Sequence, residues 1–190
     1  MILFITGTPG TGKSTTARMV AEKLSVPLIE LNQLVEDEGL YTGYHPRWRY
    51  KIVDLDALCQ HLNEIIRKSI RDKEDQEGLI VVEGHLSHYC QGADVVIVLR
   101  THPAVLGQRL EERGYKNAKI KENIEAEALD VCAFEAFQNY GDRVNEIDTT
   151  GKNPQEVVDI MVKIINGEEH FPVGEIDFLD YICQNRDENF

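Results

Sequence analysis

Near its amino terminus the chain carries residues of the types and spacing that bind phosphate groups. The stretch Gly7–Thr15, GTPGTGKST, matches the pattern G-x-x-x-x-G-K-[ST]. The glycines let the backbone curl so that successive N–H groups point at phosphate oxygens, and the helix that begins near Lys13 directs the positive end of its dipole to the same place. In such a loop the lysine reaches the β- and γ-phosphates of a nucleotide, and the hydroxyl of Ser14 holds a magnesium ion. An apolar strand before the loop and an amphipathic helix after it argue against a chance glycine-rich turn.

A carboxylate and a histidine stand at the end of another apolar run. Leu79–Val82 is followed by Glu83 and, two residues later, by His85. Ligands bind at the carboxyl ends of parallel strands, so Glu83 fits the acid that supports magnesium, directly or through water. The alternative is a solvated strand-end acid. His85 could orient an attacking group or sense the γ-phosphate. We expect His88 to be a surface residue, and a zinc site of His85, His88 and Cys90 lacks the spacing of known ligand sets.

Two arginines lie four residues apart at the end of a predicted helix, hence on one face of it. They are Arg109 and Arg113, and they lead into the basic segment Gly114–Lys119. Phosphoryl transfer concentrates negative charge on the moving group, so cationic donors must close over it. We therefore interpret the basic segment as a lid over the phosphates, hinged at Gly114. The alternative for Arg109 is an ion pair with Glu112 on a solvated face.

Two further basic segments leave their roles open. Arg47-Trp48-Arg49 could meet the phosphate of an acceptor, or RNA, and a surface loop without a role fits equally well. The stretch Thr149–Pro154 follows the last predicted strand, where a loop commonly backs the base of a nucleotide in this architecture. Lys152 is therefore a candidate to lie along adenine, with an ordinary helix-start turn as the alternative.

Short apolar runs alternate with helical patterns along the chain. This alternation, with short connections, predicts an α/β fold in which a five-stranded parallel sheet carries helices on both faces. Leu40–Val53 shows no clear period and is predicted to be a loop. The expected strands are Met1–Thr6, Pro27–Leu31, Leu79–Val82, Ala93–Leu99 and Val144–Asp148. The expected helices are Lys13–Leu24, Leu31–Glu38, a long helix capped by Asp54, Pro103–Glu112, Glu122–Tyr140 and Asn153–Ile165. The core face expected for the helix over 122–140 consists of Ile124, Leu129, Val131, Phe134 and Phe137.

Composition narrows the class of protein. The chain has 190 residues, enough for one domain with a sizeable core, and a formal net charge of −13. This balance disfavours a protein that coats nucleic acid through its overall charge, and it requires positive charge to be concentrated wherever phosphates bind. We find no signal peptide and no run approaching the roughly 20 apolar residues of a membrane span. The wide spacing of the cysteines favours reduced thiols in a cytoplasmic protein. These cysteines are Cys59, Cys90, Cys132 and Cys183.

The motifs together resemble the atypical nucleoside monophosphate kinases of the adenylate kinase isoenzyme 6 type, in their archaeal form. The resemblance covers about residues 1–166. The pair formed by Val98–Thr101 and Arg109–Tyr115 is more specific than the phosphate loop alone. The matching segments are Thr6–Thr15, Leu40–Tyr44, Glu83–His85, Val98–Thr101, Arg109–Tyr115 and Asn123–Glu125.

The resemblance implies a P-loop NTPase fold and a broad-specificity transfer of phosphate from ATP to AMP, with ATPase activity alongside and with ATP and Mg²⁺ bound. It implies a segment that binds the monophosphate at about residues 30–53 and a lid at about residues 112–122. It also implies a role in late maturation of the small ribosomal subunit, through small-subunit ribosomal protein eleven and the subunit precursor. We expect a monomer or weak dimer. The residues implied to bind ATP are Gly10, Gly12, Lys13, Ser14, Thr15 and Arg113.

The sequence departs from eukaryotic relatives in two places. They carry aspartate where Glu83 stands, so contact to the metal through water becomes plausible here. They carry arginine where Glu36 stands, which leaves open how the monophosphate is held. The acidic tail Gly167–Phe190 lies outside the shared core, and we expect it to pack as a surface appendage with disordered final residues.

Three functions remain in competition. The leading one is a nucleoside monophosphate kinase whose catalytic residues are Lys13, Arg113, Glu83, His85 and Arg109. The second is an ATP-driven assembly factor in which Glu83 and His85 position water and the kinase activity is incidental. The third is a kinase for a sugar or a shikimate-like acceptor, against which the segments Val98–Thr101 and Arg109–Tyr115 argue.

Overall fold

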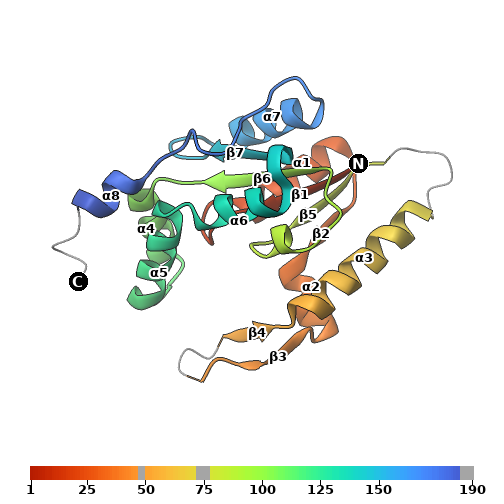
Figure 1. Cartoon of the computed structure of the whole chain (residues 1–190), viewed down its shortest axis with the longest axis horizontal. Helices are drawn as coiled ribbons and strands as arrows, with labels where there is room; N and C mark the ends of the chain where they lie inside the picture. The colour runs from red at the N-terminus through yellow and green to blue at the C-terminus, as the bar shows by residue number, and fades with distance from the viewer. Residues whose placement is uncertain (47–49, 72–77, 185–190) are drawn as a thin grey trace.

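The central element of the fold is a parallel sheet with the strand order β2-β5-β1-β6-β7 (Figure 1). The computed structural model describes residues 1–46, 50–71 and 78–184. The α/β fold expected from the sequence is therefore confirmed. Arg47, Trp48 and Arg49 lie outside the described residues. The sheet consists of β1 (Ile2–Thr6), β2 (Leu28–Glu30), β5 (Ile80–Glu83), β6 (Val95–Arg100) and β7 (Val144–Asp148).

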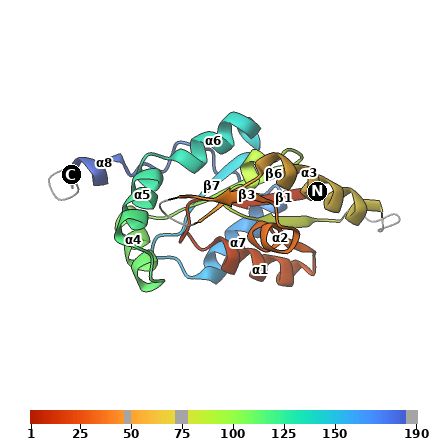
Figure 2. The same ribbon diagram turned by 90° about the horizontal axis from the view of Figure 1, so that it is seen from below.

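Helices cover both faces of this sheet (Figure 2). On one face the buried side chains of α1 and α7 pack on Leu3, Ile5 and Ile97. On the other face α3 and α6 pack on Phe4, Val82 and Val96. The apolar runs of β1, β5 and β6 lack alternation because these strands are buried on both sides. The helices are α1 (Lys13–Leu24), α2 (Leu31–Glu38), α3 (Leu55–Arg71), α4 (Pro103–Glu112), α5 (Asn117–Ala128), α6 (Val131–Tyr140), α7 (Pro154–Ile165) and α8 (Leu179–Gln184), with 3₁₀ turns η1 (Ser87–Tyr89) and η2 (Gly141–Arg143).

The segment expected to be an irregular loop, Leu40–Val53, contains a small antiparallel hairpin. Its strands are β3 (Tyr41–Tyr44) and β4 (Lys51–Val53), and their register shifts between Tyr41 and Gly43. This irregular pairing, together with the shortness of both strands, explains why no alternation is visible in the sequence. In Figure 1 the hairpin projects from the sheet on the same side as the α4–α5 pair.

The single helix predicted over Glu122–Tyr140 is wrong, because the chain breaks at Leu129 and Asp130. Asp130 takes a left-handed conformation with φ 55°, which aspartate tolerates better than most residues. The break changes which residues face the sheet. Leu129, Phe134 and Phe137, predicted to lie in the core, are 55%, 58% and 44% exposed. The buried side chains of α6 are Ala133, Ala136 and Tyr140.

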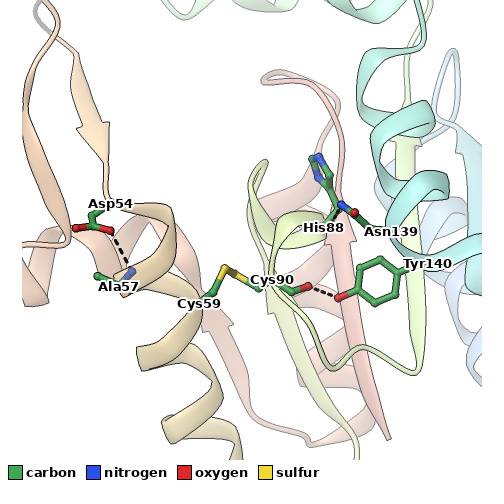
Figure 3. Close-up of a disulfide and its surroundings, with 7 residues drawn as sticks. All are labelled: Asp54, Ala57, Cys59, His88, Cys90, Asn139 and Tyr140. Carbon is green, nitrogen blue, oxygen red and sulfur yellow. Dashed lines mark hydrogen bonds between the residues drawn. A yellow bond between two sulfur atoms is a disulfide. The ribbon is translucent and has the colours of Figure 1, made fainter.

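The expectation that all four cysteines are reduced thiols is also wrong. Cys59 of α3 and Cys90, just after η1, form a disulfide across 31 residues of chain, with Cα atoms 4.9 Å apart (Figure 3). The hydroxyl of Tyr140 donates a hydrogen bond to the carbonyl of Cys90 beside it. The disulfide therefore fastens α3 to the loop that follows β5. Cys132 and Cys183 are free.

The carboxyl-terminal segment crosses the outer edge of β7. The N–H of Glu146 donates a hydrogen bond to the carbonyl of Phe171 over 2.9 Å, as it would to the carbonyl of a neighbouring strand. Further along, the rings of Phe178 and Tyr181 meet the His102 ring edge-on, with centroids 5.4 and 5.5 Å apart. The segment thus reaches from the sheet edge to the start of α4. Residues 185–190 lie outside the described residues.

Candidate active site

The phosphate loop connects the end of β1 to α1, and its glycines are required by conformation and by space. Gly7, Gly10 and Gly12 have φ values of 132°, 97° and 102°, which residues with a side chain rarely adopt. A Cβ atom on Gly7 would lie 2.4 Å from the carbonyl oxygen of Leu99, and one on Gly10 would lie 2.8 Å from Leu106. The loop can therefore curl tightly between the ends of β1 and β6.

Lys13 is buried inside this loop. Its Nζ donates to the carbonyl of Thr8 over 3.0 Å. Burial lowers the pKa of the ammonium, while the negative charges of Glu83 and Glu127 oppose the change. A buried cation held in the curl of a phosphate loop is positioned to attract phosphate oxygens.

Ser14 and Glu83 lie side by side, as a shared magnesium site requires. The hydroxyl of Ser14 donates to Oε1 of Glu83 over 3.1 Å. Glu83 is buried, and burial raises the pKa of its carboxyl against the opposing effects of Lys13 and Ser14. Two oxygen donors suit Mg²⁺, which keeps several waters and is completed by substrate phosphates. The pair fits that ion, with the remaining positions left to water and phosphate.

The zinc alternative fails. Among residues 1–46, 50–71 and 78–184, no group of three or more His, Cys, Asp or Glu side chains is placed to hold a metal ion. Cys90, one of its three proposed ligands, is consumed by the disulfide. A disulfide sulfur lacks the thiolate that zinc binds.

His85 lies partly buried after β5 and is kept neutral. Burial, with the charges of Lys13, His88 and Lys119, lowers the pKa of its imidazole to about 4. At neutral pH the ring can therefore accept as well as donate a hydrogen bond.

His88 is not the surface residue expected from the sequence. Its side chain is 1% exposed, because η1 turns it under the strand ends. Its Nδ1 lies 2.8 Å from the hydroxyl of Thr6, and its Nε2 lies 3.4 Å from Glu135 on α6. Its backbone carbonyl accepts from Asn139 over 3.0 Å (Figure 3). His88 therefore ties the residue just before the phosphate loop to α6.

Three other predicted residues line one cavity of about 230 Å³ beside the phosphate loop. Arg109, Arg113 and Lys152 border it together with Gly10, Gly12 and Thr15. Arg109 lies 3.4 Å from the carbonyl of Gly10 and makes no ion pair with Glu112 among the described contacts. Arg113 is exposed, and its charge contributes to lowering the pKa of Lys13. The structure thus separates the predicted set into two groups: Lys13, Ser14, Glu83 and His85 at the strand ends, and Arg109, Arg113 and Lys152 around the cavity.

Sequence reasoning missed a buried charge cluster that supports the loop. Arg100 is 1% exposed, and its Nε and Nη1 donate to Glu127 and Glu146 over 2.9 and 2.6 Å. Its Nη2 donates to Asp130. Burial acts to lower the pKa of this guanidinium, but the carboxylates of Glu127 and Asp130 outweigh it and raise the pKa. The second oxygen of Glu127 accepts from Thr8 of the phosphate loop. The available signal was an arginine at the end of an apolar strand, which demands buried acids.

Three features together define a P-loop kinase. They are the five-stranded parallel sheet with a phosphate loop after its first strand, the strand-end carboxylate that contacts the loop serine, and the two arginines at the end of α4. A family model described as an AAA domain matches residues 3–130. The chain belongs to the family of archaeal proteins named "Putative adenylate kinase". A relative from Methanothermobacter thermautotrophicus is 47% identical over 181 residues, covering 95% of this chain and 99% of that protein. Relatives from Methanosarcina barkeri and Pyrococcus furiosus are 41% and 40% identical, covering 96% and 94% of this chain and 100% and 91% of theirs.

Solved structures of other kinases share the fold. Shikimate kinase from Acinetobacter baumannii in complex with shikimate is 12% identical with a TM-score of 0.57, covering 88% of this chain and 94% of that chain. Thymidylate kinase from Candida albicans is 15% identical with a TM-score of 0.51, covering 87% and 91%. At these sequence identities the similarity shows a shared fold and does not identify the acceptor substrate of this protein. In the described parts of the chain, none of the helices is long and apolar enough to cross a membrane.

Proposed function

We propose that the protein transfers the γ-phosphoryl group of ATP to nucleoside monophosphates, with AMP as the principal acceptor and two ADP as the products. One observation carries this proposal. The phosphate loop follows β1, the central strand of the sheet, while β2 on one side leads into α2 and the β3–β4 hairpin, and β6 and β7 on the other side lead into residues of the cavity beside Arg109 and Arg113. A kinase for two nucleotides needs a place for each. The naming of the archaeal relatives supports the same reaction.

In this proposal ATP lies along the phosphate loop. Its phosphates meet the backbone of Gly10 and Gly12 and the side chains of Lys13, Ser14 and Thr15, and Lys152 lies along adenine. Lys13, Arg109 and Arg113 neutralise the charge on the transferring group. Mg²⁺ is held by Ser14 and by Glu83, directly or through water, and supplies further neutralisation of the phosphates. No general base is needed, because the phosphate of the acceptor is already an anionic nucleophile.

The segment around residues 30–53 is the proposed acceptor unit, and the segment around residues 112–122 is the proposed lid. The lid is more helical than the sequence suggested, because α5 begins at Asn117. Gly114, its proposed hinge, has φ 74°, and a Cβ atom built there would meet nothing within 4 Å. Glycine adopts such backbone angles readily, as a hinge residue must.

Formation of ADP tests the proposal. Protein, ATP, Mg²⁺ and AMP should yield ADP well above a control without AMP, and equal amounts would refute it. A panel of AMP, CMP, UMP, GMP and shikimate separates the alternatives. The best acceptor should be a nucleoside monophosphate. Preference for shikimate would show that the protein is instead a kinase for a shikimate-like acceptor.

A second candidate function is an ATPase that assists late maturation of the small ribosomal subunit. The observation that favours it is the neutral His85 two residues after Glu83, since a neutral imidazole can orient water. The formal net charge of −13 would steer a basic partner such as small-subunit ribosomal protein eleven toward it. ATP hydrolysis stimulated by that protein, and lost in His85→Ala, would support this function. Failure of the two proteins to co-elute at low salt would count against it.

A further inference from the structure

A lysine of the proposed lid reaches across to the proposed acceptor unit. Lys119 lies in the first turn of α5, and its Nζ is 4.9 Å from the centroid of the Tyr50 ring. Tyr50 precedes β4, and its ring stacks on His45 at 4.9 Å. The N–H of His45 donates to the carbonyl of Tyr50 over 2.8 Å. The lid and the hairpin thus meet through a cation over an aromatic ring, an interaction that is weak at an exposed site.

The position of Lys119 is set by its helix, whereas its ammonium is only loosely held. The side chain of Asn123, which is 6% exposed, donates to the carbonyl of Lys119 over 2.6 Å and fixes the backbone. The ammonium pairs with Glu122 over 3.0 Å, but the Glu122 side chain is 61% exposed. An exposed pair at this spacing contributes little to stability. The ammonium can therefore exchange its present partners for a stronger anion.

Four other described cations are engaged elsewhere. Arg109 and Arg113 line the cavity on the ATP side of the loop. Lys51 of β4 pairs with Glu36 and lies 4.3 Å from the ring of Tyr41. Arg18 pairs with Glu30 over 2.7 Å. Of these five cations, Lys119 is the one that reaches from the proposed lid to the hairpin of the proposed acceptor unit.

We propose that Lys119 binds the phosphate of the acceptor monophosphate, and that the Tyr50 ring holds its ammonium while the acceptor is absent. This inference rests on the proposed kinase function. When the acceptor enters, the ammonium leaves the ring for the phosphate and forms a charge-assisted hydrogen bond, the stronger of the two contacts.

Equilibrium binding by calorimetry tests the inference without relying on turnover. Lys119→Gln should weaken AMP binding roughly ten-fold, as expected for loss of a hydrogen bond to a charged group, and leave ATP binding within about two-fold. Lys119→Arg should retain most of the affinity for AMP, because the charge is kept. Lys163→Gln is the matched control: this lysine of α7 lies outside the site, is similarly exposed and pairs with Glu169. It should change neither affinity.

A salt series separates a phosphate contact from a structural effect. Raising the salt from about 0.05 to 0.5 M should weaken AMP binding more in the wild type than in Lys119→Gln, because screening acts on a charge pair that the variant lacks. Equal salt slopes, or equal loss of AMP and ATP affinity, would overturn the role of Lys119. If the wild type binds AMP normally but forms no ADP, the kinase proposal fails while the binding result still decides the role of Lys119.

Discussion

The hydroxyl of Thr8 in the phosphate loop donates a hydrogen bond to the carboxylate of Glu127 at the end of α5. Because Glu127 also binds Arg100 and accepts from the N–H of Thr101, one buried carboxylate connects the loop, the end of β6 and the helix that carries the proposed lid. The far end of the lid helix is therefore anchored to the site that its near end is proposed to cover.

Replacing Glu127 should destabilise the protein strongly. Glu127→Gln leaves Arg100 buried without one of its carboxylates, and we expect the free energy of unfolding in urea at pH 7 to fall by about 3 kcal/mol. Glu125→Gln, at an exposed position on the same helix, is the control and should stay within about 0.5 kcal/mol of the wild type. Equal stabilities of the two variants would show that the cluster contributes little.

Glu83 should govern the requirement for magnesium. Glu83→Gln removes the charge that faces Ser14, so the Mg²⁺ concentration for half-maximal ADP formation should rise by roughly ten-fold or more. Chelation of the metal should abolish the reaction in both proteins. Glu22→Gln, on the exposed side of α1, should leave the magnesium dependence unchanged. A variant at Glu83 with an unaltered magnesium curve and lower turnover would point to a role apart from the metal.

His85 should make stability fall in mild acid. Its folded pKa of about 4 lies below the ordinary histidine value of 6.5, so between these values the unfolded chain binds a proton that the folded chain does not. The free energy of unfolding contributed by this residue is fully present above pH 6.5 and decreases as the pH falls toward 4, by about 3 kcal/mol in total. When the free energy of unfolding in urea is measured across this pH range, it should change less with pH in His85→Gln than in the wild type. His170→Gln, at an exposed position, is the control and should follow the wild type. An NMR titration of His85 near pH 6.5 would contradict the prediction.

The disulfide should stabilise the fold by constraining the unfolded chain. For a sequence separation of 31 residues the chain-entropy relation gives about 3.7 kcal/mol. Cys59→Ser, or the wild type under a strong reductant, should lose stability of this order in denaturant unfolding. Cys183→Ser, which removes a free exposed thiol, should behave like the wild type. A wild type indifferent to reductant would show that the two thiols are not joined in solution.

The parts of the site that follow from local pattern were predictable. The phosphate loop is continuous in sequence and follows a strand. Because the carboxyl ends of parallel strands lie at the same edge of the sheet, residues that follow the other strands must lie near this loop. For that reason Ser14 and Glu83 could be paired from opposite parts of the chain before any geometry was known. The cation cluster of Arg109 and Arg113 followed from four-residue spacing on one helix.

The missed features depend on contacts between distant elements. Arg100 takes its acids from α5, from β7 and from the turn at Asp130, which lie in separate parts of the chain. If the helical period is continued through the break at Asp130 as one helix, Phe134 and Phe137 are predicted to face the sheet, whereas both are exposed. The pairing of Cys59 with Cys90 and the burial of His88 likewise depend on how α3 and η1 pack against each other. The residues next to them in sequence do not reveal this packing.

The contact between Phe171 and Glu146 has a consequence for self-association. An uncovered edge strand offers a row of unpaired N–H and C=O groups on which another chain can add as a further strand. At β7, the last strand in the sheet order, the returning chain occupies part of that row and places Gly174 against the Glu146 carboxylate. Cleavage before Phe171 would open this edge, so the carboxyl-terminal segment also protects the sheet against forming intermolecular strand pairs.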